Sequence, residues 1–105
     1  MEQILEIVNK EKRVYVGDVG TLLIVETFVD LLKATVKKIL YKKPDGTTGE
    51  WLGTVAEGNP TQIRYYLQEG DIDMAGIWKL QVYVEMPGWK GVGDVVILPV
   101  YSRIK

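Results

Sequence analysis

The chain has 105 residues, 47% of them apolar, and this length and composition favour one globular domain over a disordered chain. Thirteen basic and fourteen acidic residues leave a net charge of −1, which gives no reason to expect nucleic acid or an anionic membrane as partner. With no cysteine and no histidine, disulfides, thiolate metal sites and the usual proton shuttle are excluded. The acidic N-terminus is not a secretory signal, and no window approaches the roughly 20 apolar residues of a membrane span.

The first part of the chain predicts short strands. Residues 1–11 are expected to form an N-terminal arm or an edge strand, with the domain itself at 12–105. Glycines close the first short run and permit a tight turn before the next. The third run is expected to be irregular, because Val36 and Ile39 are three residues apart. The strands predicted here cover 13–16, 21–26 and 34–43.

The second part predicts hairpins. Pro44 presets φ and Asp45-Gly46 suits a tight reversal, so residues 43–49 read as a hairpin turn. Residues 87–93 are rich in glycine and predict a flexible loop. Pro99 within the last strand indicates an edge or a bulge, since proline lacks a ladder donor. The strands predicted here cover 50–56, 61–67, 76–86 and 94–104.

These segments give about seven strands with turns every 8–12 residues. That rhythm is typical of a sandwich or a barrel. We therefore predict an all-β fold, an immunoglobulin-like antiparallel β-sandwich.

The strand at 76–86 and the turn before it carry the clearest pattern. Trp78, Leu80, Val82 and Val84 alternate with polar residues, so one face of this strand is expected to be buried. The preceding turn resembles the corner before the sixth strand of immunoglobulin-like domains, where an aromatic residue anchors the turn to the core. We assign this structural corner to four residues, Asp73, Ala75, Gly76 and Trp78.

Two acidic or glycine-rich segments superficially resemble ligand loops. Asp71 and Asp73 lack the third oxygen ligand and the bidentate glutamate of a calcium loop, so local capping of the turn is expected instead. The glycines of 87–93 lack the Gly-Lys-Ser/Thr ending of a phosphate loop. No metal or cofactor is therefore predicted.

Aromatic and basic residues supply the candidate contacts. Trp89 and Lys90 are expected at a loop tip, where Trp89 either contacts a partner or folds back over the end of the sandwich. Flat aromatic side chains stack on sugars, which raises the alternative of a carbohydrate-binding module that contacts a surface glycan. The aromatic residues that suggest it are Trp51, Tyr65, Tyr83, Trp89 and Tyr101. The lysines from 33 to 43 contain no acid between them, which suggests either polyanion binding or protection of a sheet edge.

No catalytic residues are predicted. The single serine, Ser102, has no histidine to activate it, and the spacing brings no two acids together, including Glu50 and Glu85.

Four segments together resemble small structural proteins of bacteriophages and prophages. They are Tyr-Val-Gly-Asp-Val-Gly-Thr at 15–21, Val-Asp-Leu with Ala-Thr at 29–35, the Lys-Lys-Pro-Asp-Gly hairpin at 42–46 and the Asp-x-Asp-x-Ala-Gly-x-Trp corner at 71–78. The chain is similar, over roughly 13–101, to the immunoglobulin-like N-terminal module of phage baseplate upper proteins. The resemblance implies a non-enzymatic structural or adhesive module, a tail, baseplate or decoration protein. Its partners would be other virion proteins, and its location the virion, or the host cytoplasm during assembly. The segment Ile4–Val8 could then add a strand to a neighbouring sheet.

Overall fold

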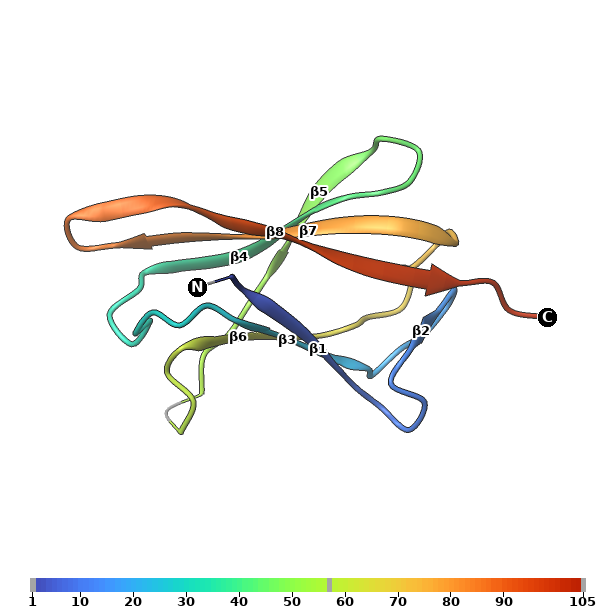
Figure 1. Cartoon of the computed structure of the whole chain (residues 1–105), viewed down its shortest axis with the longest axis horizontal. Helices are drawn as coiled ribbons and strands as arrows, with labels where there is room; N and C mark the ends of the chain where they lie inside the picture. Colours follow the sequence, from blue (N-terminus) through green and yellow to red (C-terminus); the bar gives the residue numbers. More distant parts are fainter. Residues whose placement is uncertain (1, 57, 105) are drawn as a thin grey trace.

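The computed structural model describes residues 2–56 and 58–104 and shows two β-sheets packed face to face (Figure 1). The all-β sandwich predicted from the sequence is confirmed. No helix in the described residues is long and apolar enough to cross a membrane. The strands are β1 (Ile4–Val8), β2 (Val14–Tyr15), β3 (Leu22–Glu26), β4 (Val36–Lys42), β5 (Thr48–Leu52), β6 (Gln62–Tyr66), β7 (Gly76–Met86) and β8 (Trp89–Tyr101).

The strand order is that of an immunoglobulin-like sandwich. One sheet has the order β1-β3-β6 and the other the order β2-β8-β7-β4-β5. All pairs are antiparallel except β2 with β8, which run parallel over two residues. The described residues therefore hold eight strands, the seven predicted ones and β1, which lies in the segment expected to be an arm or an edge strand.

The core fills the space between the sheets. Alternation along β7 buries Trp78, Leu80, Val82 and Val84, as the sequence predicted. An aromatic layer joins the two sheets, because Trp51 of β5 stacks on Tyr65 of β6 with ring centroids 5.0 Å apart.

Two predictions about β4 are corrected. β4 pairs with β7 in continuous register from Val36 to Lys42, so the irregularity expected in β4 is absent. The register shift lies instead between β7 and β8 at Gln81/Tyr83. β4 is also an interior strand between β7 and β5, so its lysines do not protect a sheet edge.

Residues 87–93 do not form a flexible loop. Only Pro87 and Gly88 lie between β7 and β8, and Gly88 has a φ of 81°. Proline presets the first turn position and glycine accepts the positive φ of the second, so two residues suffice to reverse the chain. β8 therefore begins at Trp89, five residues before the predicted start of this strand.

The predictions about the sheet edges agree better with the structure. β1 pairs with β3 over its whole length, which makes it an edge strand and not a free arm. Along β8, only Val100 and Tyr101 pair with β2, so the outer side of Pro99 has no ladder partner. The edge interpretation of Pro99 is confirmed, and the bulge lies elsewhere.

Candidate protein-contact site

The predicted corner anchors the turn before β7 to the core. Trp78 is 0% exposed, and its indole N–H donates to the carbonyl of Met74, 3.1 Å away. Asp73 accepts a hydrogen bond from Lys43 Nζ at 2.8 Å, and this hydrogen bond raises the pKa of Lys43. Gly76, which follows the half-buried Ala75, has a φ of 126°. These contacts tie the turn to the core.

The structure adds a contact that the sequence did not predict, because the corner packs on the β4–β5 hairpin. A Cβ at Gly76 would lie 2.7 Å from Cγ of Pro44. The Lys43 ammonium lies 5.6 Å from the centroid of the Trp78 ring. The two turn motifs, about 30 residues apart in sequence, therefore stabilise each other.

In the segment that superficially resembles a calcium loop, the acidic side chains form hydrogen bonds with other groups of the protein. Asp71 accepts hydrogen bonds from the Tyr65 hydroxyl at 2.5 Å and from the Gln68 N–H at 2.7 Å. Burial, together with this hydrogen bond to Asp71, raises the pKa of Tyr65. In the described part of the chain, no three acidic side chains gather as they would to hold a metal ion.

The best candidate for a functional site is a cleft at the opposite end of the sandwich. In Figure 1 the β7–β8 hairpin and the β3–β4 connection lie one above the other at the left end. Between them is a cleft of about 580 Å³, within the usual range of binding pockets. We call it the hairpin-end cleft. Its apolar walls come from Val84, Met86 and Trp89 on one side and from Val29 and Leu31 on the other.

Trp89 forms the outer part of the hairpin wall. It pairs with Met86 across the ladder and is 52% exposed. Its ring lies over Gly91, where a Cβ would be 2.9 Å from Cζ2 of the indole. Glycine at this position is therefore what lets the ring lie flat along the strand, with one side open to the cleft.

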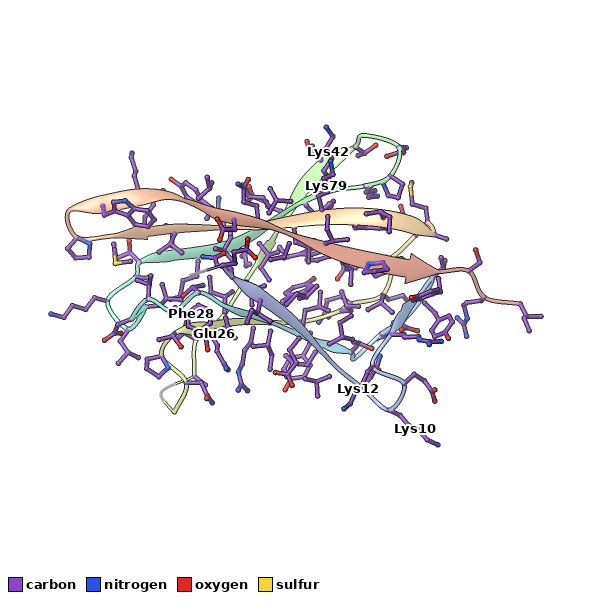
Figure 2. All side chains as sticks on the ribbon, viewed as in Figure 1. Lys10, Lys12, Glu26, Phe28, Lys42 and Lys79 are labelled. Atoms are coloured by element: carbon purple, nitrogen blue, oxygen red, sulfur yellow. The ribbon has the colours of Figure 1, made fainter. Side chains whose placement is uncertain are left out.

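A strained residue, Phe28, lies beside the opposite wall, between the cleft-lining Thr27 and Val29, but its own side chain does not line the cleft. Phe28 has a φ of 60° and is 42% exposed, although bulky side chains rarely adopt this left-handed conformation. Its N–H donates to Glu26 Oε2 at 2.9 Å, and the two residues are labelled together in Figure 2. Burial of the Glu26 carboxyl opposes its ionisation, but hydrogen bonds from Thr61 and from the Phe28 N–H outweigh this, so its pKa is lowered.

Hydrogen bonds to the carbonyls of Pro60 and Thr61, just before β6, hold the backbone around Phe28 in place. The buried Thr27 hydroxyl donates to the carbonyl of Thr61 at 2.7 Å and accepts from the N–H of Val29 at 3.2 Å. Leu31 N–H donates to the carbonyl of Pro60 at 2.8 Å. Strained residues persist only where their surroundings determine them this completely, and they gather at functional sites.

The base of the cleft is polar. The Gln3 N–H donates to Asp94 Oδ2 at 3.2 Å, and the Gln3 side chain occupies the space that a Cβ at Gly93 would need. Within residues 2–56 and 58–104, Gln3 Oε1 is buried without a hydrogen-bond partner. A buried acceptor without a partner lowers stability, so this oxygen is a local cost at the cleft.

The structure separates the three contact residues predicted from the sequence. Trp89 lines the cleft, but Lys90 follows it on the strand and therefore points to the other face of the hairpin, opposite Glu85. The prediction that Trp51 is a contact residue is wrong, because Trp51 is 5% exposed and packs between Tyr41 and Tyr65 in the core. Its indole faces are covered and offer no surface to a glycan or a protein.

Three exposed apolar residues of the β3–β4 connection were not predicted as contact residues: Phe28, Val29 and Leu32. The available signal was the apolar segment Phe-Val-Asp-Leu-Leu between two predicted strands, where a polar connection is the norm. Only Leu31 of this segment is buried, so the other apolar side chains remain available for contact.

The side chains of the cleft suit binding better than catalysis. Asp94 is the one carboxylate among its described lining residues, and the Thr27 hydroxyl is occupied by the backbone. Elsewhere, Glu50 forms an ion pair with Lys38 at 2.9 Å and Glu85 accepts from the Tyr83 hydroxyl at 2.6 Å. This hydrogen bond raises the pKa of Tyr83. Glu50 and Glu85 thus have separate partners.

Comparison with known proteins adds no family. No family model matches the chain, and no curated protein matches it.

Proposed function

We propose that this chain is a non-enzymatic structural module of a bacteriophage or prophage particle, and that it contacts another virion protein through the hairpin-end cleft. The carrying observation is the state of Phe28, an exposed phenyl group held in a strained backbone conformation beside an open apolar cleft. Strain and exposure both cost stability, and both favour binding, because a rigid apolar surface loses little entropy when it is covered.

The virion setting is supported by the resemblance of the turn motifs to phage baseplate modules. The sandwich fold is compatible with it but is shared by many unrelated proteins. A rigid two-sheet scaffold that presents contact residues at one end is a common way to build a binding module.

The glycan alternative has less support. Of the aromatic residues that suggested it, Trp51 is buried and Tyr65 is partly covered by its stack with Trp51. Tyr101 is exposed but lies at the other end of β8 from Trp89. These rings do not form one flat platform of the kind on which sugars stack.

The proposal is tested by inducing particles from a strain that carries the gene and fractionating them on a density gradient. We expect the chain to sediment with the particles at a fixed copy number. A double variant, Phe28→Gly with Trp89→Ala, is expected to fold but to fall at least tenfold in particle-bound copies. A control variant, Tyr66→Ala, removes an exposed aromatic of β6 outside the cleft and is expected to incorporate normally.

Two results would contradict the proposal. One is a chain that stays entirely at the top of the gradient while particles form without it. The other is binding to a glycan array that Trp89→Ala abolishes, which would favour the carbohydrate-binding alternative.

A further inference from the structure

A second surface lies on the outer face of the five-stranded sheet, away from the core. Because Leu80 and Val82 point inward, Lys79 and Gln81 of β7 point outward. The register then places Ile97 and Val95 of β8 beside them on the same face. We call this surface the outer face.

One part of the outer face is an aliphatic strip. Ile77, Val95 and Ile97 are each about half exposed, and the register makes them neighbours on two adjacent strands. Single exposed apolar residues are ordinary, but a contiguous group on a sheet face marks a contact surface. The side chains are β-branched and stiff, so little entropy is lost when a partner covers them.

Next to this strip are two lysines of like charge. Lys42 and Lys79 lie directly opposite each other on β4 and β7 and are exposed, and Figure 2 labels them side by side. Like charges in this position repel each other across the strands. Lys38, the next outward lysine on β4, is neutralised by Glu50 at 2.9 Å. Over residues 2–56 and 58–104, no acid lies within ion-pair distance of Lys42 or Lys79.

A groove of about 460 Å³ connects the lysines with the strip. Its lining includes Lys42 and Lys79 together with Leu40, Gln81 and Val95. Glu50 also lines the groove, where its carboxylate is paired with Lys38. A chain lying in this groove would meet a positive charge and aliphatic side chains within a few residues.

The charges favour one kind of occupant. The register gives the outer face four lysines, at 38, 42, 79 and 90, against two glutamates, at 50 and 85. A second copy of the chain would bring the same positive surface against itself, which is unfavourable. A nucleic acid would find positive charge but would leave the aliphatic strip exposed to water.

We propose that the outer face binds an acidic protein segment. Its carboxylates bind Lys42 and Lys79, and its aliphatic side chains cover Ile77, Val95 and Ile97. This interaction is independent of the hairpin-end cleft and goes beyond the function proposed above.

The test uses the full chain and a peptide, Glu-Glu-Val-Val-Glu-Glu-Val-Val. In an extended conformation each face of this peptide presents both glutamate and valine. Backbone amide shifts are followed by NMR during titration, and the dissociation constant is taken from the shifts. A control peptide replaces each glutamate with lysine. We expect the acidic peptide to shift the amides of Ile77, Lys79, Val95 and their neighbours, and the basic peptide to shift none of them.

Charge-reversal variants then distinguish binding at this site from nonspecific electrostatic attraction of the peptide to the protein. The double variant Lys42→Glu with Lys79→Glu is expected to weaken the acidic peptide at least tenfold. Its matched control, Lys10→Glu with Lys12→Glu, makes the same change of charge on the β1–β2 loop, far from this face in Figure 2. That control is expected to change binding less than twofold. Ile97→Ser should also weaken binding, which shows that charge alone does not account for it.

Five outcomes would overturn the proposal. Four of them are no shifts at millimolar peptide, shifts located elsewhere, equal weakening by the two charge reversals, and self-association through the outer face in light scattering. Tighter binding to a DNA duplex than to the acidic peptide, at physiological salt, would also overturn it in favour of a nucleic-acid site.

Discussion

The two ends of the sandwich differ in how completely their side chains are buried and hydrogen-bonded. At the end of the Trp78 corner, a buried indole has its hydrogen-bond partner, Asp73 has its lysine, and the positive φ at Gly76 is held by a glycine, which tolerates it. At the hairpin-end cleft, Trp89 is half exposed, Gln3 Oε1 lacks a partner among the described residues and a phenylalanine adopts a positive φ. The difference indicates that the corner residues stabilise the fold. The residues at the cleft lower its stability locally, and a bound partner would offset this loss.

The largest expected effect comes from exchanging the two tryptophans for alanine. Trp78→Ala should lower the free energy of unfolding by roughly 3–5 kcal/mol, as expected for a buried aromatic. Trp89→Ala should lower it by less than about 1 kcal/mol, since substitutions at exposed positions change stability little. Urea denaturation measures both values. Similar losses for the two variants would remove the contrast between the ends.

Much of the corner could be predicted from the sequence because the cause is local. Side chains alternate strictly along a strand, so the period of two in Trp78, Leu80 and Val82 already identifies the buried face. Pro44 and Gly46 fix a hairpin turn by their own backbone preferences. What the sequence did not show is that this hairpin packs on Gly76, because that contact depends on how distant segments meet.

The cleft was harder to predict because its causes are not local. Gly91 and Gly93 read as a flexible loop, yet one lies under the Trp89 ring and the other under the Gln3 side chain. The conformation of Phe28 depends on Thr61 and Pro60, more than 30 residues away in sequence, which bond its neighbours. No propensity predicts a phenylalanine at positive φ, so this residue could be found only in the structure.

A smaller loss of stability is expected when a methyl group is added to Gly76. Gly76→Ala should cost about 2 kcal/mol, because the residue has an unfavourable φ and the new Cβ would press on Pro44. The matched control is Gly46→Ala, which has a φ of 90° but no atom within 4 Å of the new Cβ. It should cost only about 1 kcal/mol. Equal losses in thermal or urea unfolding would mean that the contact between hairpin and corner contributes nothing.

The pH dependence of stability tests the hydrogen bond between Tyr65 and Asp71 in the turn before β7. The pKa of Tyr65 is raised above its ordinary value of 10.0, first by burial and then by its hydrogen bond to Asp71. Above pH 10 the unfolded chain therefore loses a proton that the folded chain keeps, so stability is full below this pH and falls as pH rises beyond it.

Tyr65→Phe should make that alkaline fall shallower, because the phenol that titrates in the unfolded state is gone. The exposed Tyr66→Phe on the same strand is the control and should leave the slope as it is. Unfolding free energies at intervals between pH 8 and pH 11 measure both slopes, in steps small enough to resolve a single proton. A slope unchanged by Tyr65→Phe would mean that the hydrogen bond to Asp71 does not raise the pKa of Tyr65 in the folded chain.

The most direct test of the central claim, that the hairpin end is strained in a way that folding does not require, compares two variants of Phe28. Phe28→Gly and Phe28→Ala both remove the phenyl group, so their difference in unfolding free energy reports the backbone conformation alone. At a positive φ, glycine should be the more stable of the two by about 1 kcal/mol. If alanine is as stable as glycine or more so, Phe28 is not strained and the proposed contrast between the two ends fails.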